Sequence, residues 1–321
     1  MWDAESASEI AVLRGHTREV GDVCWSPDST ELASVSFGTI KVWKFDELAR
    51  RWNSAQARQG IRNLIWSPDG ATIALGGASG VQILDAESGR VLSQADASQS
   101  ACWSMWARTI GWSPAHHLLA VQRHQQTVLL HERSLEPLQT WQLPPAEEAR
   151  SIAVSPDGSR LAIGSWQAPH DDDVGFVRIL ELPSAREASV FQLPLRFVGT
   201  LDWSPDGSRL ACAAMDRCAI VDAQAGTILS ECIVDGGTTW TLAVAWHPMG
   251  QRVALGCSDR SIRIFDDKSQ AAQLVLRGHT SEVRSVCWNP DGSRLASSGT
   301  DRTLRIRNLD TGAMLPTLTD Q

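Results

Sequence analysis

The stretch WSPDG occurs at residues 66–70 and again at residues 203–207. Similar motifs occur at five further positions: WSPDS begins at 25, WSPAH at 112, VSPDG at 154, WHPMG at 246 and WNPDG at 288. Successive copies are separated by 41, 46, 42, 49, 43 and 42 residues. A self-similar period of roughly forty residues is typical of a propeller or a solenoid.

The residues around each copy distinguish these two architectures. Pro-Asp-Gly forms a tight turn, because proline presets its own dihedral angle and glycine accepts a left-handed one. An apolar stretch such as VRSVCW (283–288) precedes the turn, and two short aliphatic runs, RLASSG (294–299) and TLRIRNL (303–309), follow it. A fourth run resembles AQLVLRG (272–278), which leaves no room for a helix. Four short strands repeated seven times predict an all-β, seven-bladed β-propeller of four-stranded antiparallel blades.

Composition excludes several classes of function. The formal net charge is -8, and the lysines number only three, which argues against nucleic acid and anionic membranes as main partners. The chain has no run of eighteen apolar residues, and its acidic start, MWDAESASEI, lacks the features of a secretory signal. The seven cysteines are scattered without a CxxC pair, so we expect a reducing cytoplasm and no zinc site. Frequent arginine and alanine suggest a GC-rich bacterial genome.

Two stretches carry a family resemblance. Gly15-His16 and Gly278-His279 are each preceded by Leu-Arg and followed by Thr, and VWK (42–44) and IFD (264–266) end two of the repeats. Together with the turn aspartates Asp259 and Asp301, these residues resemble the WD-repeat (tryptophan–aspartate) propellers. The resemblance covers nearly the whole chain, and it is strong at both ends and degenerate in the middle.

The resemblance implies an internal hydrogen-bond network rather than a catalytic site. In the last repeat it would join His279, Ser297 and Asp301, with Arg307 standing where the family has its closing tryptophan. In the first repeat His16 and Trp43 are present, but the turn VSFGT is one residue short and lacks the aspartate. The alternative interpretation of His279, Ser297 and Asp301 is a catalytic Ser–His–Asp triad. Buried polar groups need partners, and these three supply them for one another.

The repeat pattern also predicts how the ring closes. IAVLRGHT (10–17) repeats LVLRGHT (274–280), which leads from the outer strand of one blade into the next. We therefore expect residues 9–13 to form the outer strand of blade seven, beside residues 303–308, in competition with the tail at 311–318. We expect one propeller domain over residues 1–321. Trp2-Asp3 resembles the end of a preceding repeat, so the chain is a candidate fragment of a longer protein.

No cofactor is expected, because the sequence contains no phosphate-binding loop, GxSxG or HExxH motif. The best metal-like cluster is His170 with the acidic residues 171–173. Three adjacent carboxylates could hold a hard cation such as calcium. Their spacing does not match an EF-hand, and we interpret them as a solvated acidic loop without a metal.

A different set of residues suggests a binding surface. We name the strands of a blade a to d from the innermost outward, so that the a–b and c–d turns share one face and the b–c and d–a connections share the other. The positions six residues before each turn-motif tryptophan (or Val154) are Glu19, Gly60, Trp106, Glu148, Phe197, Trp240 and Glu282. Two positions later come Gly21, Arg62, Arg108, Arg150, Gly199, Leu242 and Arg284.

Both sets belong near the channel mouth on the b–c/d–a face, to which Phe37 and Met215 in b–c turns would add apolar surface. Large aromatics and arginines are the residues from which binding hot spots are built. The alternative is that Trp106 and Trp240 merely fill gaps between blades. The longest insertions, at 98–106 and 167–175, fall on the same face, as is common for a binding face.

The leading hypothesis is a non-catalytic scaffold or sensor module that binds a protein or peptide of mixed charge. One alternative is an enzyme or metal-binding propeller that uses the central channel, and another is a purely structural repeat module. Covalently linked effector domains in a longer parent chain would fit the first hypothesis. The sequence does not identify the partner.

Overall fold

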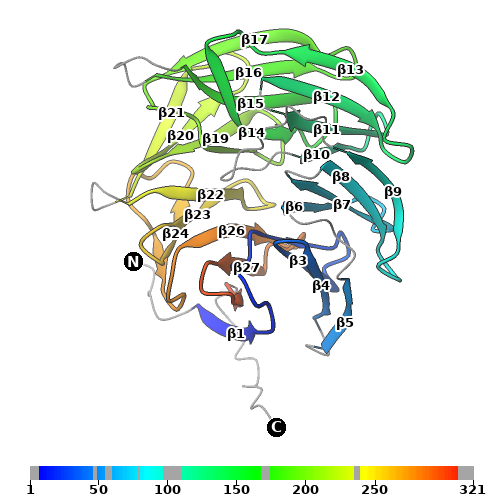
Figure 1. Cartoon of the computed structure of the whole chain (residues 1–321). Coiled ribbons are helices and arrows are strands. Elements are labelled where there is room, and N and C mark those ends of the chain that lie inside the picture. The colour runs from blue at the N-terminus through cyan, green and yellow to red at the C-terminus, as the bar shows by residue number, and fades with distance from the viewer. Residues whose placement is uncertain are drawn as a thin grey trace.

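A computed structural model describes residues 7–45, 49–54, 60–77, 80–96, 110–123, 125–167, 174–234 and 239–309. The described part is all-β and contains seven four-stranded antiparallel sheets (Figure 1). The inner strands contact one another in sequence around the ring, and β2 of the first blade contacts β26 of the last. The predicted seven-bladed propeller is therefore confirmed. The described residues include no helix long and apolar enough to cross a bilayer.

The first six blades take their strands in chain order. Blade 1 contains β2 (Asp22–Trp25), β3 (Glu31–Ser36), β4 (Thr39–Lys44) and β5 (Ala49–Ser54). Blade 2 contains β6 (Ile61–Trp66), β7 (Thr72–Gly77), β8 (Gly80–Asp85) and β9 (Val91–Asp96). Blade 3 contains β10 (Ile110–Ser113), β11 (Leu118–Arg123), β12 (Gln126–His131) and β13 (Pro137–Gln142). Blade 4 contains β14 (Glu147–Val154), β15 (Arg160–Gln167), β16 (Gly175–Glu181) and β17 (Arg186–Leu193).

The last blade combines both ends of the described chain. Blade 5 contains β18 (Thr200–Trp203), β19 (Arg209–Ala214), β20 (Arg217–Asp222) and β21 (Ile228–Ile233). Blade 6 contains β22 (Thr241–Trp246), β23 (Arg252–Cys257), β24 (Ile262–Asp266) and β25 (Leu274–Leu276). Blade 7 contains β26 (Val283–Trp288), β27 (Arg294–Gly299), β28 (Leu304–Asn308) and β1 (Ser8–Leu13).

Strand β1 closes the ring as the outer strand of blade 7. It pairs antiparallel with β28, from Ser8 opposite Asn308 to Leu13 opposite Leu304. Closure removes an open sheet edge, which would otherwise expose unpaired backbone groups. The prediction that residues 9–13 take this place is confirmed, while the competing tail at 311–318 lies outside the described residues.

The repeated turn is held by its own side chains. In blade 5 the hydroxyl of Ser204 donates to Asp206 Oδ1 at 2.5 Å, and the same carboxylate oxygen accepts the backbone N–H of Ser208 at 3.0 Å. These hydrogen bonds, led by the one from Ser204, lower the pKa of Asp206 to about 2. Gly207 follows with φ 67°, the left-handed conformation that glycine adopts without strain. The turn motif is thus a self-contained structural unit.

The hydrophobic core lies between blades rather than within them. One cluster of buried side chains fills each of the seven junctions. Three of the turn-motif tryptophans also donate their indole N–H to a carbonyl of the preceding blade: Trp66 to Cys24, Trp203 to Ala153 and Trp288 to Ala245. These three tryptophans therefore couple neighbouring blades through both packing and a hydrogen bond.

Candidate functional site

The antiparallel meander sorts the connections onto two faces. The b–c turns and the d–a connections lie on one face, which we call the loop face; Phe37, Met215 and Trp240 belong to it. The a–b turns and the c–d turns lie on the other, which we call the turn face; the Ser-Pro-Asp turns that begin at Ser67 and Ser204 belong to it. The sequence-predicted binding residues that the structure describes lie in loop-face connections or in the a strands that follow them.

Phe37 and Arg62 come together where blades 1 and 2 meet. Phe37 occupies a two-residue turn between β3 and β4 with φ 44°. The Arg62 guanidinium lies 4.3 Å from the centroid of the Phe37 ring, and that of Arg18 lies 5.2 Å from it. Arg62 also pairs with Glu19 at 3.3 Å. The ring is thus enclosed by two cations, and Arg18 is a member of the cluster that sequence reasoning missed.

A second arginine–aromatic pair stands on blade 4. The Arg150 guanidinium lies 5.4 Å from the ring centroid of Trp166, whose indole N–H donates to Glu148 at 3.2 Å. Strand β14 already begins at Glu147, so Glu148 and Arg150 lie inside strand a rather than at its entrance. The sequence did not predict Trp166 as a member of this cluster. It lies at the end of strand b, and the alignment compared only the positions that precede each turn motif.

The residues of blade 5 form a shallow hollow. Met215, with φ 43°, lies in the b–c turn and lines a cavity of about 400 Å³ together with Arg196, Asp216 and Arg217. Phe197 is half-buried and packs against the hydrophobic cluster of blades 4 and 5. Phe197 is therefore in part a core residue, whereas Met215 contributes to an open surface.

Trp240 is the most exposed of the predicted aromatic residues that the structure describes. The residue retains 48% of its accessible surface, and its backbone is fixed by two hydrogen bonds with Ser258. In the adjacent blade 7, Arg284 pairs with Glu282 at 3.0 Å. Trp106, Arg108 and the acidic residues 171–173 lie outside the described residues.

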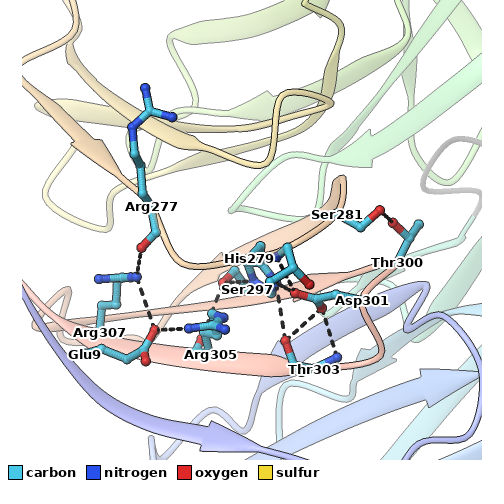
Figure 2. Close-up of polar contacts among 11 residues, drawn as sticks. Glu9, Arg277, His279, Ser281, Ser297, Thr300, Asp301, Thr303, Arg305 and Arg307 are labelled. Carbon is cyan, nitrogen blue, oxygen red and sulfur yellow. Dashed lines mark hydrogen bonds and ion pairs between the residues drawn. The ribbon is translucent and has the colours of Figure 1, made fainter.

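The predicted polar network of blade 7 has the order serine–histidine–aspartate (Figure 2). His279 Nε2 lies 2.9 Å from the Ser297 hydroxyl, and His279 Nδ1 lies 2.9 Å from Asp301 Oδ2. Asp301 further accepts bonds from the backbone N–H of Thr280 and from the hydroxyl of Thr303. Burial alone would raise the pKa of Asp301, but these hydrogen bonds, led by that of His279, outweigh it and hold the pKa below its ordinary value.

This order matches that of a nucleophile, a general base and its orienting carboxylate in a catalytic triad. The three residues, however, are not open to a substrate. Ser297 retains 1% of its surface and His279 retains 7%, so a substrate cannot reach the hydroxyl. Ser297 continues the chain of bonds to the carbonyl of Arg305 at 3.5 Å. Arg307, in the place of the closing tryptophan, instead donates to the carbonyl of Arg277 and pairs with Glu9 (Figure 2). The geometry suits a structural network.

The corresponding network of blade 1 is complete at one end only. His16 Nε2 lies 2.8 Å from the Ser34 hydroxyl, which also accepts the indole N–H of Trp43 at 3.1 Å. His16 Nδ1 is buried without a partner among the described residues, because the turn aspartate is missing. Burial, and then the charge of Lys41, lower the pKa of His16 to about 4.

The described residues contain no group of three or more histidine, cysteine or acidic side chains that could hold a metal ion. Six of the seven cysteines are described, and all six are free thiols. Burial raises the pKa of Cys212 to about 12, so this thiol is a poor nucleophile.

Comparison with known families identifies two matches. The WD domain, G-beta repeat family matches residues 7–44, 191–221, 230–266 and 271–308. The Anaphase-promoting complex subunit 4 WD40 domain family matches residues 37–109. Together these matches cover residues 7–109 and most of residues 191–308.

Three similar curated proteins come from eukaryotes. The chain is 34% identical over 126 residues to the chromatin assembly factor 1 subunit FAS2 homolog of Oryza sativa subsp. japonica, covering 37% of this chain and 23% of the relative. It is 30% identical over 132 residues to the WD repeat-containing protein SL1-17 of Schistosoma mansoni, covering 41% and 38%. It is 23% identical over 276 residues to THO complex subunit 3 of Arabidopsis thaliana, covering 84% and 82%. The chain thus spans less than half the length of the first two relatives.

Proposed function

Because the chain belongs to the WD-repeat β-propellers, we propose that it is a non-catalytic interaction module that binds a protein or peptide on its loop face. The relatives support the general role, since two of them are named as subunits of larger assemblies, chromatin assembly factor 1 and the THO complex.

The exposure of Trp240 is the observation that favours the loop face as the binding surface. It is the one large aromatic side chain among the described residues that ranks as exposed; the other exposed large apolar residues are aliphatic or methionine. A solvent-exposed tryptophan costs free energy that a partner surface can recover, and tryptophan is enriched in binding hot spots. Its backbone is fixed by Ser258, so little ordering entropy would be lost on binding.

Arginines on the same face favour a peptide of mixed charge. Arg62 and Arg150 lie against Phe37 and Trp166, and both also have a carboxylate close by, in Glu19 and Glu148. Such clusters present cations, carboxylates and aromatic edges together. A guanidinium can pair with a carboxylate of the partner or stack on an aromatic ring. The chain's net charge of -8 disfavours nucleic acid as the partner.

The proposal places the protein in the cytoplasm and needs no cofactor. The odd number of cysteines and the free thiols of the described part agree with a reducing compartment. The residues that we propose to bind the partner are Phe37, Arg62, Trp106, Arg108, Arg150, Phe197, Met215, Trp240 and Arg284. Effector domains linked to the module in a longer parent chain are part of the same proposal.

Two exposed side chains of blade 6 allow a matched test. The double variant Trp240→Ala, Arg284→Glu alters the loop face, and Met249→Ala alters the turn face, where Met249 retains 72% of its surface. Partners captured from a lysate by the wild-type module would be purified and titrated against all three proteins by calorimetry. We expect the double variant to weaken binding at least tenfold, with Met249→Ala unchanged. Equal loss in both variants, or loss from Met249→Ala alone, would refute the choice of face.

A further inference from the structure

An arginine at one repeat position joins neighbouring blades at three junctions of the turn face. Each of these arginines begins strand b of its blade and lies over an aromatic ring of the next blade. The distances from guanidinium carbon to ring centroid are 4.6 Å for Arg160 over Trp203, 4.8 Å for Arg209 over Trp246 and 4.1 Å for Arg294 over Phe45. The geometry is that of a cation–π contact. At these three junctions, the guanidinium thus fills the space between the start of strand b and the next blade.

The junction of blades 5 and 6 shows the complete set of contacts. Arg209 stacks on Trp246, forms an ion pair with Asp267 and donates to the carbonyl of Gly250 at 3.0 Å. Asp267 directly follows strand c of blade 6 and retains 8% of its surface. An indole face, a buried carboxylate and a turn carbonyl together form a site for one guanidinium, which the chain occupies itself.

The junction of blades 2 and 3 keeps the aromatic ring and the carboxylate but lacks the arginine. Thr72 begins β7 at the position of Arg209, Trp112 stands at the position of Trp246, and Glu132 directly follows strand c, as Asp267 does. The backbone repeats the equivalence: Glu132 N donates to His117 O at 3.1 Å, and Asp267 N donates to Gln251 O at 3.0 Å.

A groove lies where the missing arginine would be. It has a volume of about 470 Å³, and its lining includes Thr72, Trp112, Glu132, Asp69 and Leu92. In the described part of the chain no arginine stacks on Trp112, whose indole N–H donates to Glu132 at 3.0 Å. Leu92 is 46% exposed and offers an apolar wall. The groove is therefore lined by the indole of Trp112, which retains 7% of its surface, by an exposed leucine and by acidic groups.

The charged groups at the groove are two carboxylates, one arginine and one histidine. Asp69 accepts bonds from Ser67 at 2.5 Å and from Ala71 N at 3.0 Å, both on Oδ1, and its pKa is lowered, first by the Ser67 bond. Glu132 Oε1 lies 2.9 Å from Nδ1 of His117. Arg133 also lines the groove and lowers the pKa of Asp69 through its charge. Arg133 is thus the local competitor of an incoming cation.

We propose that this groove binds an arginine side chain of a partner protein. The guanidinium would lie on Trp112 and meet the carboxylates of Glu132 and Asp69, and its aliphatic stem would lie along Leu92. Arginine fits better than lysine, because its planar group stacks on an indole and presents several donors at once. This surface is on the turn face, opposite the loop face, and stands independently of the partner site proposed there.

The test uses a small defined probe and the whole chain. The peptide acetyl-Gly-Arg-Gly-amide is titrated into the ¹⁵N-labelled protein, and the indole N–H signal of Trp112, assigned with Trp112→Phe, is followed by NMR. The matching peptide with citrulline, a neutral analogue of arginine, is the ligand control. We expect saturable shifts with the arginine peptide and binding weaker by about tenfold or more with citrulline. Equal binding of the two peptides, or no shift at millimolar peptide, would overturn the proposal.

Variants test the site from the protein side. Thr72→Arg should abolish peptide binding and raise the melting temperature, because it supplies the stacking group from within, whereas Thr72→Val should bind as the wild type does. Arg133→Ala should tighten binding by removing the competing charge. The reverse change, Arg209→Thr, should create a second site reported by the indole of Trp246, because Asp267 and the carbonyl of Gly250 would remain there. Undiminished peptide binding by Thr72→Arg would contradict the proposed position of the ligand.

Discussion

Glu9 Oε2 lies 2.6 Å from Nη1 of Arg305, across an ion pair that joins the first described strand to the last (Figure 2). Arg307 approaches the same oxygen at 3.1 Å. The two arginine side chains are about nine-tenths buried, at 11% and 10% exposure, and both contact this one carboxylate. Arg307 also donates to the carbonyl of Arg277. The ring closure is therefore electrostatic as well as a matter of strand pairing.

Deleting residues 1–14 should lower the melting temperature markedly, because the edge of β28 would lose its partner. The finer variant Glu9→Gln should cost on the order of 1–3 kcal/mol, since it leaves two partly buried arginines without a countercharge. Thermal and urea unfolding followed by circular dichroism measure both. Glu136→Gln, at an exposed turn, is the control and should behave as the wild type. An unchanged midpoint in the truncated chain would contradict closure by β1.

His279→Ala should destabilise the fold by roughly 1–3 kcal/mol, because it leaves Ser297 and Asp301 buried without their shared partner. Partner binding on the loop face should survive in the folded fraction. His116→Ala, in the a–b turn of blade 3, provides the comparison. Loss of a function at unchanged stability would instead argue for a chemical role of the trio.

His16 should make the fold sensitive to mild acid. Its pKa is about 4 in the folded chain and 6.5 in the unfolded chain, so between these values the unfolded state binds more protons. The stability that this residue provides is complete above pH 6.5 and is lost as the pH falls toward 4, by on the order of 3 kcal/mol in total. Urea unfolding at pH 7.0 and pH 4.5 measures the loss, which His16→Gln should reduce. Parallel losses in both proteins would exclude His16 as the cause.

The stacked arginines should contribute unequally to stability. Arg160→Ala removes the contact with Trp203 and a hydrogen bond to the Gly207 carbonyl, for about 1–2 kcal/mol. Arg209→Ala should cost more, roughly 3 kcal/mol, because it also leaves Asp267 buried as an unpaired charge.

Arg252→Ala is the matched control for these two variants. Arg252 begins strand b of blade 6, but the next tryptophan, Trp288, is contacted at that junction by His247, with ring centroids 4.6 Å apart. We expect a change of less than about 0.5 kcal/mol. Costs of the same size at all three positions would show that the stacking geometry is not the source of the stability.

Much of the fold followed from local chemistry in the sequence. The serine, aspartate and glycine of each Ser-Pro-Asp-Gly turn bond within five residues, so the turn forms wherever those letters stand. The near-identity of residues 10–17 and 274–280 was enough to predict β1 as the closing strand. The bonding of His279 to Ser297 and Asp301 was expected from the family resemblance, as was the displacement of the closing tryptophan by Arg307.

Contacts between blades were not predictable in the same way. Arg62 contacts Phe37 from the neighbouring blade, and Arg18 contacts the same ring from the connection before β2. Trp166 contacts Arg150 from the end of strand b, outside the positions compared in the turn alignment. The positions of Trp106 and Arg108 stay predictions.

The sequence by itself determined the number of blades, the turns and the closing strand, because each depends on residues that are close in the chain or that repeat with its period. Only the tertiary structure decided what fills the junctions between blades. Thr72 in place of an arginine is visible in an alignment of the repeats, yet its consequence appears only when Trp112 and Glu132 of the next blade are placed around it. A side chain's partner across a junction depends on the packing and twist of two sheets, which no local pattern encodes.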